Sequence, residues 1–364
     1  MRGPGADRVV PVVEAADALR RGLLRRVLRV PGVRGVFVSP ERRIPLAFGG
    51  AVAASLLLAV LHPVGLLLWG VALFGIPHVL SGVRHLALRR RLHPLSRVLC
   101  LTAVVLGAGL LFGGGRPVLK AVTVCFALSV LVELWSAPGV PALPRLGASA
   151  AVLVGSALAL AFHGLFLVAV THLHALGSIL FCAHLARRRG ISHLPLTVGV
   201  ALGALAIALG GFDATLLGVG LGTAVGPDEV VGWLGGTFAE ARPEVAHRML
   251  VLYAFGQSVH YAVWVRLVPE LDRPSPVPWS FRRGLEALRR DAGPWAVPAL
   301  VACAAGTVWL LRGGAPARET YFALVYFHMG LEAAGFTRSL LVAPLGATGG
   351  SARRGGTGRG FEPA

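Results

Sequence analysis

Histidines within apolar segments are the residues of this sequence best suited to chemistry. The stretch 161–189, AFHGLFLVAVTHLHALGSILFCAHLARRR, is apolar enough to cross a membrane. Four histidines lie along it: His163, His172, His174 and His184. Three other apolar runs carry a histidine near the middle: His78, His260 and His328. Ionisable side chains are costly inside a bilayer, so several of them at this depth indicate a functional site.

Helical spacing predicts that four helices present imidazole at one level. At about 1.5 Å per residue, histidines in four runs fall within roughly a third of the membrane thickness of one another: His78, His172 and His174, His260, and His328. Two residues rotate a helix by about 200°, so His172 and His174 face opposite sides and only one of them faces a shared site. Imidazoles without an excess of carboxylates favour iron, copper or zinc, or an axial haem position.

Polar side chains on the same helices extend this candidate site. Glu332 follows His328 by four residues, so its carboxylate can orient the imidazole or join the metal ligands. Glu133 is another carboxylate inside an apolar run, and Tyr253 shares a helical face with His260. We therefore take Glu332, Glu133 and Tyr253 as candidate catalytic residues.

Other histidines are weaker candidates. His85 and His184 lie nearer the cytoplasmic ends of their runs, where they form a second layer of candidate ligands or extend toward neighbouring arginines. A single membrane histidine often serves only as an interhelical hydrogen-bond donor, worth about 1 kcal/mol. Five more are expected to be solvated at interfaces or in loops: His62, His93, His163, His193 and His247.

The composition predicts the scaffold that must position these residues. Hydrophobic residues make up 55% of the 364 residues and charged residues 14%, which is too apolar for a soluble domain of this length. The net charge of +18 comes from arginines clustered beside apolar runs, as in cytoplasmic anchors of membrane proteins. We therefore expect a lipid bilayer, and no nucleic acid, as a partner. The frequent Ala, Gly, Leu and Arg are typical of GC-rich bacterial genomes, so we expect a multi-pass protein of the bacterial inner membrane.

Apolar runs of near the required ~20 residues predict an all-α, polytopic integral membrane bundle of about ten transmembrane helices. The runs are Pro45–Leu61, Val64–Leu88, Leu95–Phe112, Val118–Trp135, Leu146–Phe162, Gly164–Ala186, Leu194–Leu217, His247–Val268, Trp295–Leu311 and Tyr321–Val342. Alternate crossings place the arginine clusters at 89–91, 187–189, 282–290 and 353–359 on one side, so the positive-inside rule predicts that both termini are cytoplasmic.

Three regions follow from this pattern. Residues 1–43 form a basic cytoplasmic segment, in which Asp17–Val30 predicts an interfacial amphipathic helix. Residues 44–345 form the membrane domain, and residues 346–364 are a low-complexity tail expected to be disordered. Gly226–Glu244 is an expected external loop, and Pro269–Gly293 an expected cytoplasmic loop that ends in a basic amphipathic helix.

Several motifs that would indicate other chemistry are missing from the sequence. There is no HExxH zinc-protease motif, no Walker motif and no GxGxxG that opens a helix after a strand. The histidines lie within the apolar runs, unlike the histidine boxes of membrane desaturases, which lie in loops beside them. The site is therefore expected within the membrane, where its substrate would be lipid-soluble or a small gas or ion.

The stretch YAFGQSVHYAVW at 253–264, together with single histidines on several helices, resembles the Brp/Blh family of membrane β-carotene dioxygenases. The resemblance covers about half of the chain, and ten spans exceed the number expected of that family. It implies that a non-haem iron cleaves a carotenoid to retinal. It also implies that the iron ligands are His78, His174, His260 and His328.

Three functions remain open at this stage. The first is a non-haem iron oxygenase that acts with dioxygen on an apolar, carotenoid- or isoprenoid-like small molecule. The second is a haem-binding redox protein with bis-histidine ligation. The third is a transporter that uses the polar residues of the midplane as an ion or proton path. Protein partners and the oligomeric state cannot be predicted from the sequence.

The predicted topology can be tested with reporter fusions. Because an odd number of spans separates the two points, fusions placed after Gly114 and after Arg189 should report opposite sides of the membrane. Activity of one reporter at both points would contradict the topology.

Overall fold

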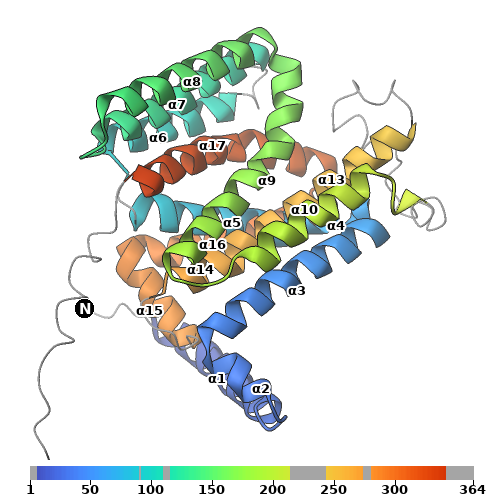
Figure 1. Ribbon diagram of the computed structural model, residues 1–364. Coiled ribbons are helices and arrows are strands. Elements are labelled where there is room, and N and C mark those ends of the chain that lie inside the picture. Colours follow the sequence, from blue (N-terminus) through green and yellow to red (C-terminus); the bar gives the residue numbers. More distant parts are fainter. Residues whose placement is uncertain (1–5, 90–91, 110–114, 214–242, 274–279, 342–364) are drawn as a thin grey trace, which may run out of the picture.

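The computed structural model describes residues 6–89, 92–109, 115–213, 243–273 and 280–341, and every element within these ranges is helical (Figure 1). The predicted all-helical class is confirmed. The first half of the chain contains α1 (Ala6–Val27), α2 (Val33–Val38), α3 (Pro40–Leu61), α4 (Pro63–Gly70), η1 (Val71–Gly75), α5 (Ile76–Gly82), η2 (Val83–Leu88), α6 (Pro94–Ala108), α7 (Gly115–Ser136) and α8 (Ala142–Ala161). The second half contains α9 (His163–Arg188), α10 (Leu194–Ala208), α13 (Pro243–Ala262), η4 (Val263–Leu267), α14 (Val268–Leu271), α15 (Phe281–Ala292), η5 (Gly293–Trp295), α16 (Ala296–Arg312) and α17 (Gly314–Leu341).

Helices long and apolar enough to cross a membrane are present, as expected. Among the described residues there are five: Pro40–Leu61, Pro63–Leu88, Gly115–Ser136, Ala142–Ala161 and Phe281–Arg312. The apolar helices α6 and α10 are shorter. Each of the ten predicted runs falls mainly on a helix over its described part, but the number of spans and the cytoplasmic location of the termini stay predictions.

The seventh predicted run, Leu194–Leu217, differs from the helix that the structure shows. Helix α10 ends at Ala208, because Gly210 adopts a φ of 80° and reverses the chain. The carboxylate of Asp213 pairs with Arg248 of α13, with 2.5 Å between the two atoms, so the chain after α10 is polar at this point. The remainder of this run, most of the predicted external loop Gly226–Glu244 and the whole tail 346–364 lie outside the described residues.

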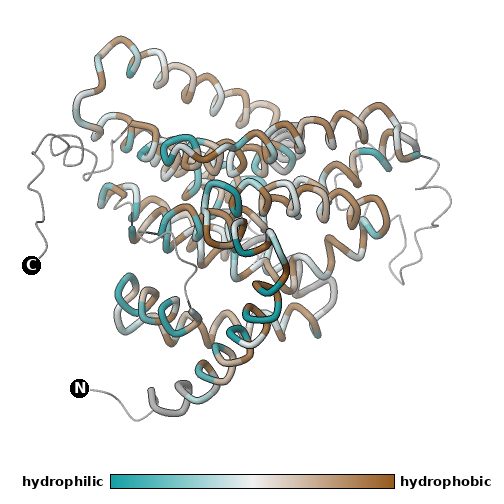
Figure 2. Tube along the Cα trace, turned by 60° about the horizontal axis from the view of Figure 1, so that its bottom comes forward, coloured by the Kyte–Doolittle hydropathy of each residue, from teal (hydrophilic) through white to brown (hydrophobic). Residues whose placement is uncertain are grey.

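Helices α9, α13 and α17 and the continuous helix Pro63–Leu88 lie together at the centre of the bundle (Figure 1). Helices α6, α7 and α8 form a layer beside α17, whereas α3 and α10 pack against α13 on the other side. Hydrophobic residues dominate these long helices, and hydrophilic residues are frequent near the N-terminus (Figure 2). The four central helices are also those that carry the candidate histidines.

Glycines set a close, parallel register between helix Pro63–Leu88 and α17. The hydroxyl oxygen of Tyr321 lies only 2.7 Å from the position that a β-carbon would take at Gly75. Seven residues further along both helices, the ring of His328 occupies the place of a β-carbon at Gly82. Leu86 then packs against Gly335. Small residues allow helix backbones to approach closely in membranes, and here they let two large aromatic rings lie on the neighbouring backbone.

The first helix is held against α15 by one carboxylate. Both oxygens of Asp17 accept backbone hydrogen bonds, from Phe281 at 2.8 Å and from Arg282 at 3.1 Å. The side chain of Ser280 accepts a third, from Arg283. These bonds satisfy the N-terminal N–H groups of α15, the helix that corresponds to the predicted basic amphipathic segment. The amphipathic helix was predicted over Asp17–Val30. In the structure the corresponding helix, α1, begins earlier, at Ala6, and ends at Val27.

Asp17 should control the docking of α1. Burial raises the pKa of its carboxyl group, but the hydrogen bonds from α15 and the charges of Arg20 and Arg21 together lower it by more, so the pKa lies below its ordinary value. The docking should therefore be complete above the unfolded pKa of about 3.9 and be lost as the pH falls below that value. Spin labels at Gly22 and Gly284, where nothing lies within 4 Å of an added β-carbon, should give one narrow distance at pH 7.

The change Asp17→Asn should broaden this distance at pH 7. The matched control is Glu14→Gln, because the Glu14 carboxylate is mostly exposed and lies 4.0 Å from Arg282. A narrow distribution in Asp17→Asn would show that the carboxylate does not hold the helix.

Candidate metal centre

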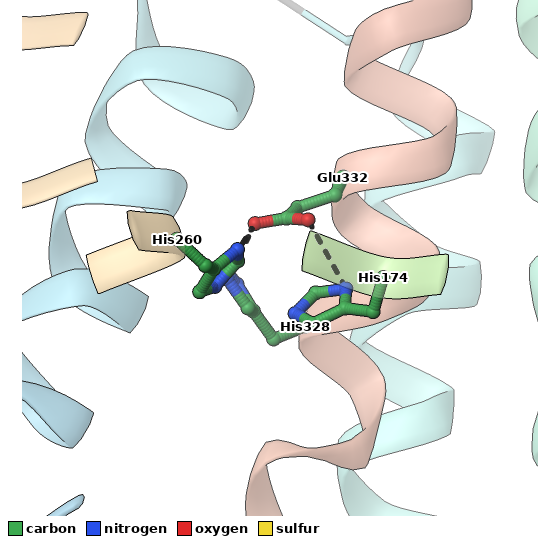
Figure 3. A group of neighbouring side chains, drawn as sticks. All are labelled: His174, His260, His328 and Glu332. Atoms are coloured by element: carbon green, nitrogen blue, oxygen red, sulfur yellow. Dashed lines mark ion pairs between the residues drawn. The ribbon is translucent and has the colours of Figure 1, made fainter. Parts of the chain in front are cut away.

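Three imidazoles and one carboxylate meet at the centre of the bundle. They belong to His174 on α9, His260 on α13, and His328 and Glu332 on α17 (Figure 3). Each side chain offers one ligand atom, and these atoms all lie within 4.8 Å of one another. Metal bonds of about 2.0–2.2 Å place the ligand atoms around one ion roughly 3–4 Å apart. A small inward movement of these side chains would therefore close them around a metal ion.

The carboxylate of Glu332 lies between the three rings. Its Oε2 is 3.2 Å from Nδ1 of His174, and its Oε1 is 2.9 Å from Nε2 of His328 and 3.9 Å from Nε2 of His260. Despite these distances, neither oxygen has a hydrogen bond of acceptable geometry to any described residue. A carboxylate that is buried without hydrogen bonds is strongly disfavoured, and a cation at this point would remove that penalty.

Hydrogen bonds fix the protonation of His260. Its Nδ1 lies 2.9 Å from the hydroxyl oxygen of Ser178, whose own proton is donated to the backbone carbonyl of Ala175 at 2.8 Å. The hydroxyl must therefore accept from His260, so Nδ1 carries the proton and Nε2 keeps its lone pair. This is the arrangement usual for a histidine that binds a metal, because its second N–H is held by a neighbouring acceptor.

His78 adjoins the group from helix Pro63–Leu88. Its ring centroid lies 4.8 Å from that of His328 and 5.0 Å from that of His260. The backbone carbonyl of Phe74 accepts a hydrogen bond from Nδ1 of His78 at 3.2 Å, which leaves Nε2 unprotonated. His78 is thus a further nitrogen donor beside the four, with the ring of Tyr261 on its other side, centroids 4.9 Å apart.

Widened helical turns flank two of these histidines. His78 lies between the π-helical segments η1 and η2, and His260 lies in the last turn of α13, three residues before the π-helical segment η4 begins at Val263. Such turns are rare and frequently occur at functional sites, because an extra residue in the turn changes which side chains face a neighbour. Their presence beside His78 on helix Pro63–Leu88 and beside His260 on α13 supports the assignment of the site to the part of the bundle where these histidines lie.

The structure separates the remaining candidates from the group. It places His174, and not His172, among the four ligand atoms, whereas the His172 ring lies 5.6 Å from that of Tyr253. Tyr253 is buried but contributes no atom to the group. His184 lies ten residues after His174 on α9, outside the group.

Glu133 has a different environment. Its Oε1 accepts a hydrogen bond from the backbone N–H of His93 at 2.7 Å, and its Oε2 lies 3.6 Å from Arg338. The carboxylate therefore ties α7 to the start of α6 and to α17, and the structure does not bring it into the group of ligand atoms. His85 is also outside the group and pairs with Asp272.

Two residues that position the candidate ligands, Ser178 and Gly82, were not among the site residues predicted from the sequence. Ser178 follows His174 by four residues, so it lies on the same face of α9, but a serine in an apolar helix more often bonds to its own backbone. Gly82 follows Gly75 by seven residues, a spacing that indicates close helix packing. Neither signal shows which ring the residue contacts.

The change Gly82→Ala should disrupt the metal centre. A methyl group would collide with Cε1 of His328, so the ring must move away from the other ligands. By analogy with the loss of supporting contacts around metal ligands, we expect metal affinity to fall about 10- to 100-fold, measured by titration of the purified protein. The control is Gly50→Ala on α3, where nothing lies within 4 Å of the added carbon. Equal affinities in the two variants would contradict this account.

Comparisons of the chain with protein-family models, with curated proteins and with solved structures found no match. What can be concluded about the site therefore depends on its own geometry and chemistry.

Proposed function

We propose that this protein is a membrane-embedded metal enzyme, a non-haem iron oxygenase that acts on a lipid-soluble substrate of the carotenoid or isoprenoid class. The observation that carries the proposal is the convergence of three imidazoles and one buried carboxylate on one point. Two of the carboxylate contacts cross between helices, from α17 to α9 and to α13. A purely structural carboxylate at such depth would be expected to have well-aligned hydrogen-bond donors. Among the described residues Glu332 has the indole of Trp264 nearby, but no hydrogen bond of acceptable geometry.

The chemistry of the ligands supports iron. Imidazole suits iron, copper and zinc, and a histidine set that includes one carboxylate is typical of non-haem iron sites with open positions. Bound iron would supply redox chemistry with dioxygen at those positions. His174, His260, His328 and Glu332 would hold the ion, and His78 would either bind it or line the open side. Ser178 would keep His260 in the tautomer that binds metal.

The surroundings support an apolar substrate. Trp264 and Phe336 are stacked at an interplanar angle of 5°, and Phe181 is stacked on Phe336 with centroids 4.6 Å apart. The Trp264 ring lies 6.2 Å from His328 and is fully buried. These rings give one side of the centre an apolar surface, which would suit an apolar substrate.

The geometry favours this function over bis-histidine haem binding. A haem needs a flat slot between two axial imidazoles, whereas the space between His174, His260 and His328 holds the carboxylate of Glu332 (Figure 3). No specific contact among the described residues favours the transporter.

Metal analysis and an absorption spectrum of the purified protein should separate these functions. We expect about one equivalent of iron per chain and no Soret band, because the proposed ligands bind iron without a porphyrin. A Soret band would indicate haem, and the absence of both iron and a Soret band would contradict the proposed enzyme.

Single substitutions should identify the ligands. Each of five variants should abolish activity: His174→Ala, His260→Ala, His328→Ala, Glu332→Ala and His78→Ala. The first four should also lose most of the bound metal. Expression in β-carotene-producing bacteria would show the activity as loss of colour and formation of retinal. His62→Ala and His193→Ala are the controls, because neither residue contributes to the group, and both should keep colour loss and metal at wild-type levels. Wild-type metal content in all four ligand variants would overturn the site.

A further inference from the structure

A buried histidine and a partly exposed carboxylate form a second pair close to the metal centre. Nδ1 of His85 lies 2.8 Å from Oδ2 of Asp272. Because a carboxylate only accepts, His85 donates from Nδ1 and its Nε2 keeps a lone pair. That Nε2 is buried and has no hydrogen-bond partner among the described residues. The imidazole therefore presents an unprotonated nitrogen to the interior while its other nitrogen contacts Asp272.

The register of the helices places His85 directly beyond the metal ligands. Helix Pro63–Leu88 and α17 run parallel, with His328 against Gly82 and Gly335 against Leu86. His85 lies between these two contacts and follows His78 by seven residues, so it is one layer further along the same side of its helix. Helical side chains lean toward the N-terminal end of their helix, so the His85 ring leans back toward the level of Gly82.

The other end of the pair reaches water. The side chain of Asp272 is 20% exposed, whereas that of His85 is 3% exposed. The charged groups around the pair are Arg84 on η2, Arg89 directly after η2, and Asp291 on α15. Arg89 lies 2.6 Å from Asp272, Arg84 lies 2.7 Å from Asp291, and Arg89 also lies 3.7 Å from Asp291. Two arginines therefore accompany the two carboxylates, so the formal charges around the pair balance.

We propose that His85 and Asp272 exchange protons between the metal centre and water at this end of the bundle. The proposal rests on the proposed function, because it requires a metal in the centre. A proton released at the centre bonds to Nε2 of His85. The proton on Nδ1 then passes to Oδ2 of Asp272 and from there to bulk water, and rotation of the ring restores the original state.

One ordered water would complete this path. Nδ1 of His328 is buried and, like Nε2 of His85, has no hydrogen-bond partner within the described ranges. When His328 binds a metal through Nε2, its Nδ1 carries a proton that needs an acceptor. A buried water requires two or more polar partners, and these two nitrogens, from adjoining layers of the same helix pair, provide them.

Cobalt provides a probe that does not depend on the substrate. The purified full-length protein would be loaded with Co²⁺, whose visible spectrum reports protonation of its ligands and bound water, and exposed to a rapid change of pH. The wild-type spectrum should respond within the mixing time. In His85→Gln and in Asp272→Asn the cobalt content and the final spectrum should be unchanged, but the response should be at least about tenfold slower. In His85→Ala, added imidazole should restore the fast response, which a purely structural role of His85 would not explain.

The matched control is Ser81→Ala, on the same helix one turn before His85. It removes a hydrogen bond to the backbone carbonyl of Trp264 without touching the pair, so its response should be as fast as that of the wild type. A fast response in His85→Gln, or a wild-type spectrum that does not change with pH, would overturn the relay. Loss of cobalt from His85→Gln would show that His85 supports the ligands instead. A wild-type protein that binds no cobalt or iron would overturn the metal centre itself.

Discussion

The buried carboxylate of Glu332 is the constraint on which the structure depends. A charge taken out of water is penalised by several kcal/mol unless it is paired, and Glu332 is 2% exposed in a mainly apolar bundle. Its close polar neighbours among the described residues are imidazoles from three helices and the indole of Trp264. A cation held by the four side chains, as proposed above, would remove this penalty.

Close helix packing makes this convergence possible. Glycines on helix Pro63–Leu88 let Tyr321 and His328 lie against its backbone, so rings from α17 reach the centre without displacing the helix. The π-helical turns next to His78 and His260 shift the helical faces that follow them. The layer that contains Trp264, Phe181 and Phe336 then fills the space on one side of the ligands. Close packing of the helices thus brings the polar side chains together at the centre of an otherwise apolar bundle.

Much of the fold could be predicted from hydropathy, because each long apolar run is independent of its neighbours. Depth alone brought His78, His172, His174, His260 and His328 to one level but did not choose between His172 and His174, and the spacing of four residues paired His328 with Glu332. Contacts between helices could not be predicted in this way. Glu133 has the same hydropathic context as Glu332, but it accepts a hydrogen bond from His93, and only the packing of α6 on α7 shows the difference. The end of α10 was missed because leucines after Gly210 continue the apolar pattern beyond the turn.

The four candidate ligand atoms come from three distant parts of the chain, at residue 174, at residue 260, and at residues 328 and 332. During synthesis the first histidine enters the membrane long before the last two residues leave the ribosome. An incompletely synthesised chain therefore lacks some of the four side chains. A metal ion could bind such a chain only through one or two histidines. If these side chains hold the metal proposed above, the complete site forms only when α17 has joined the bundle, and only then can all four donors bind one ion together.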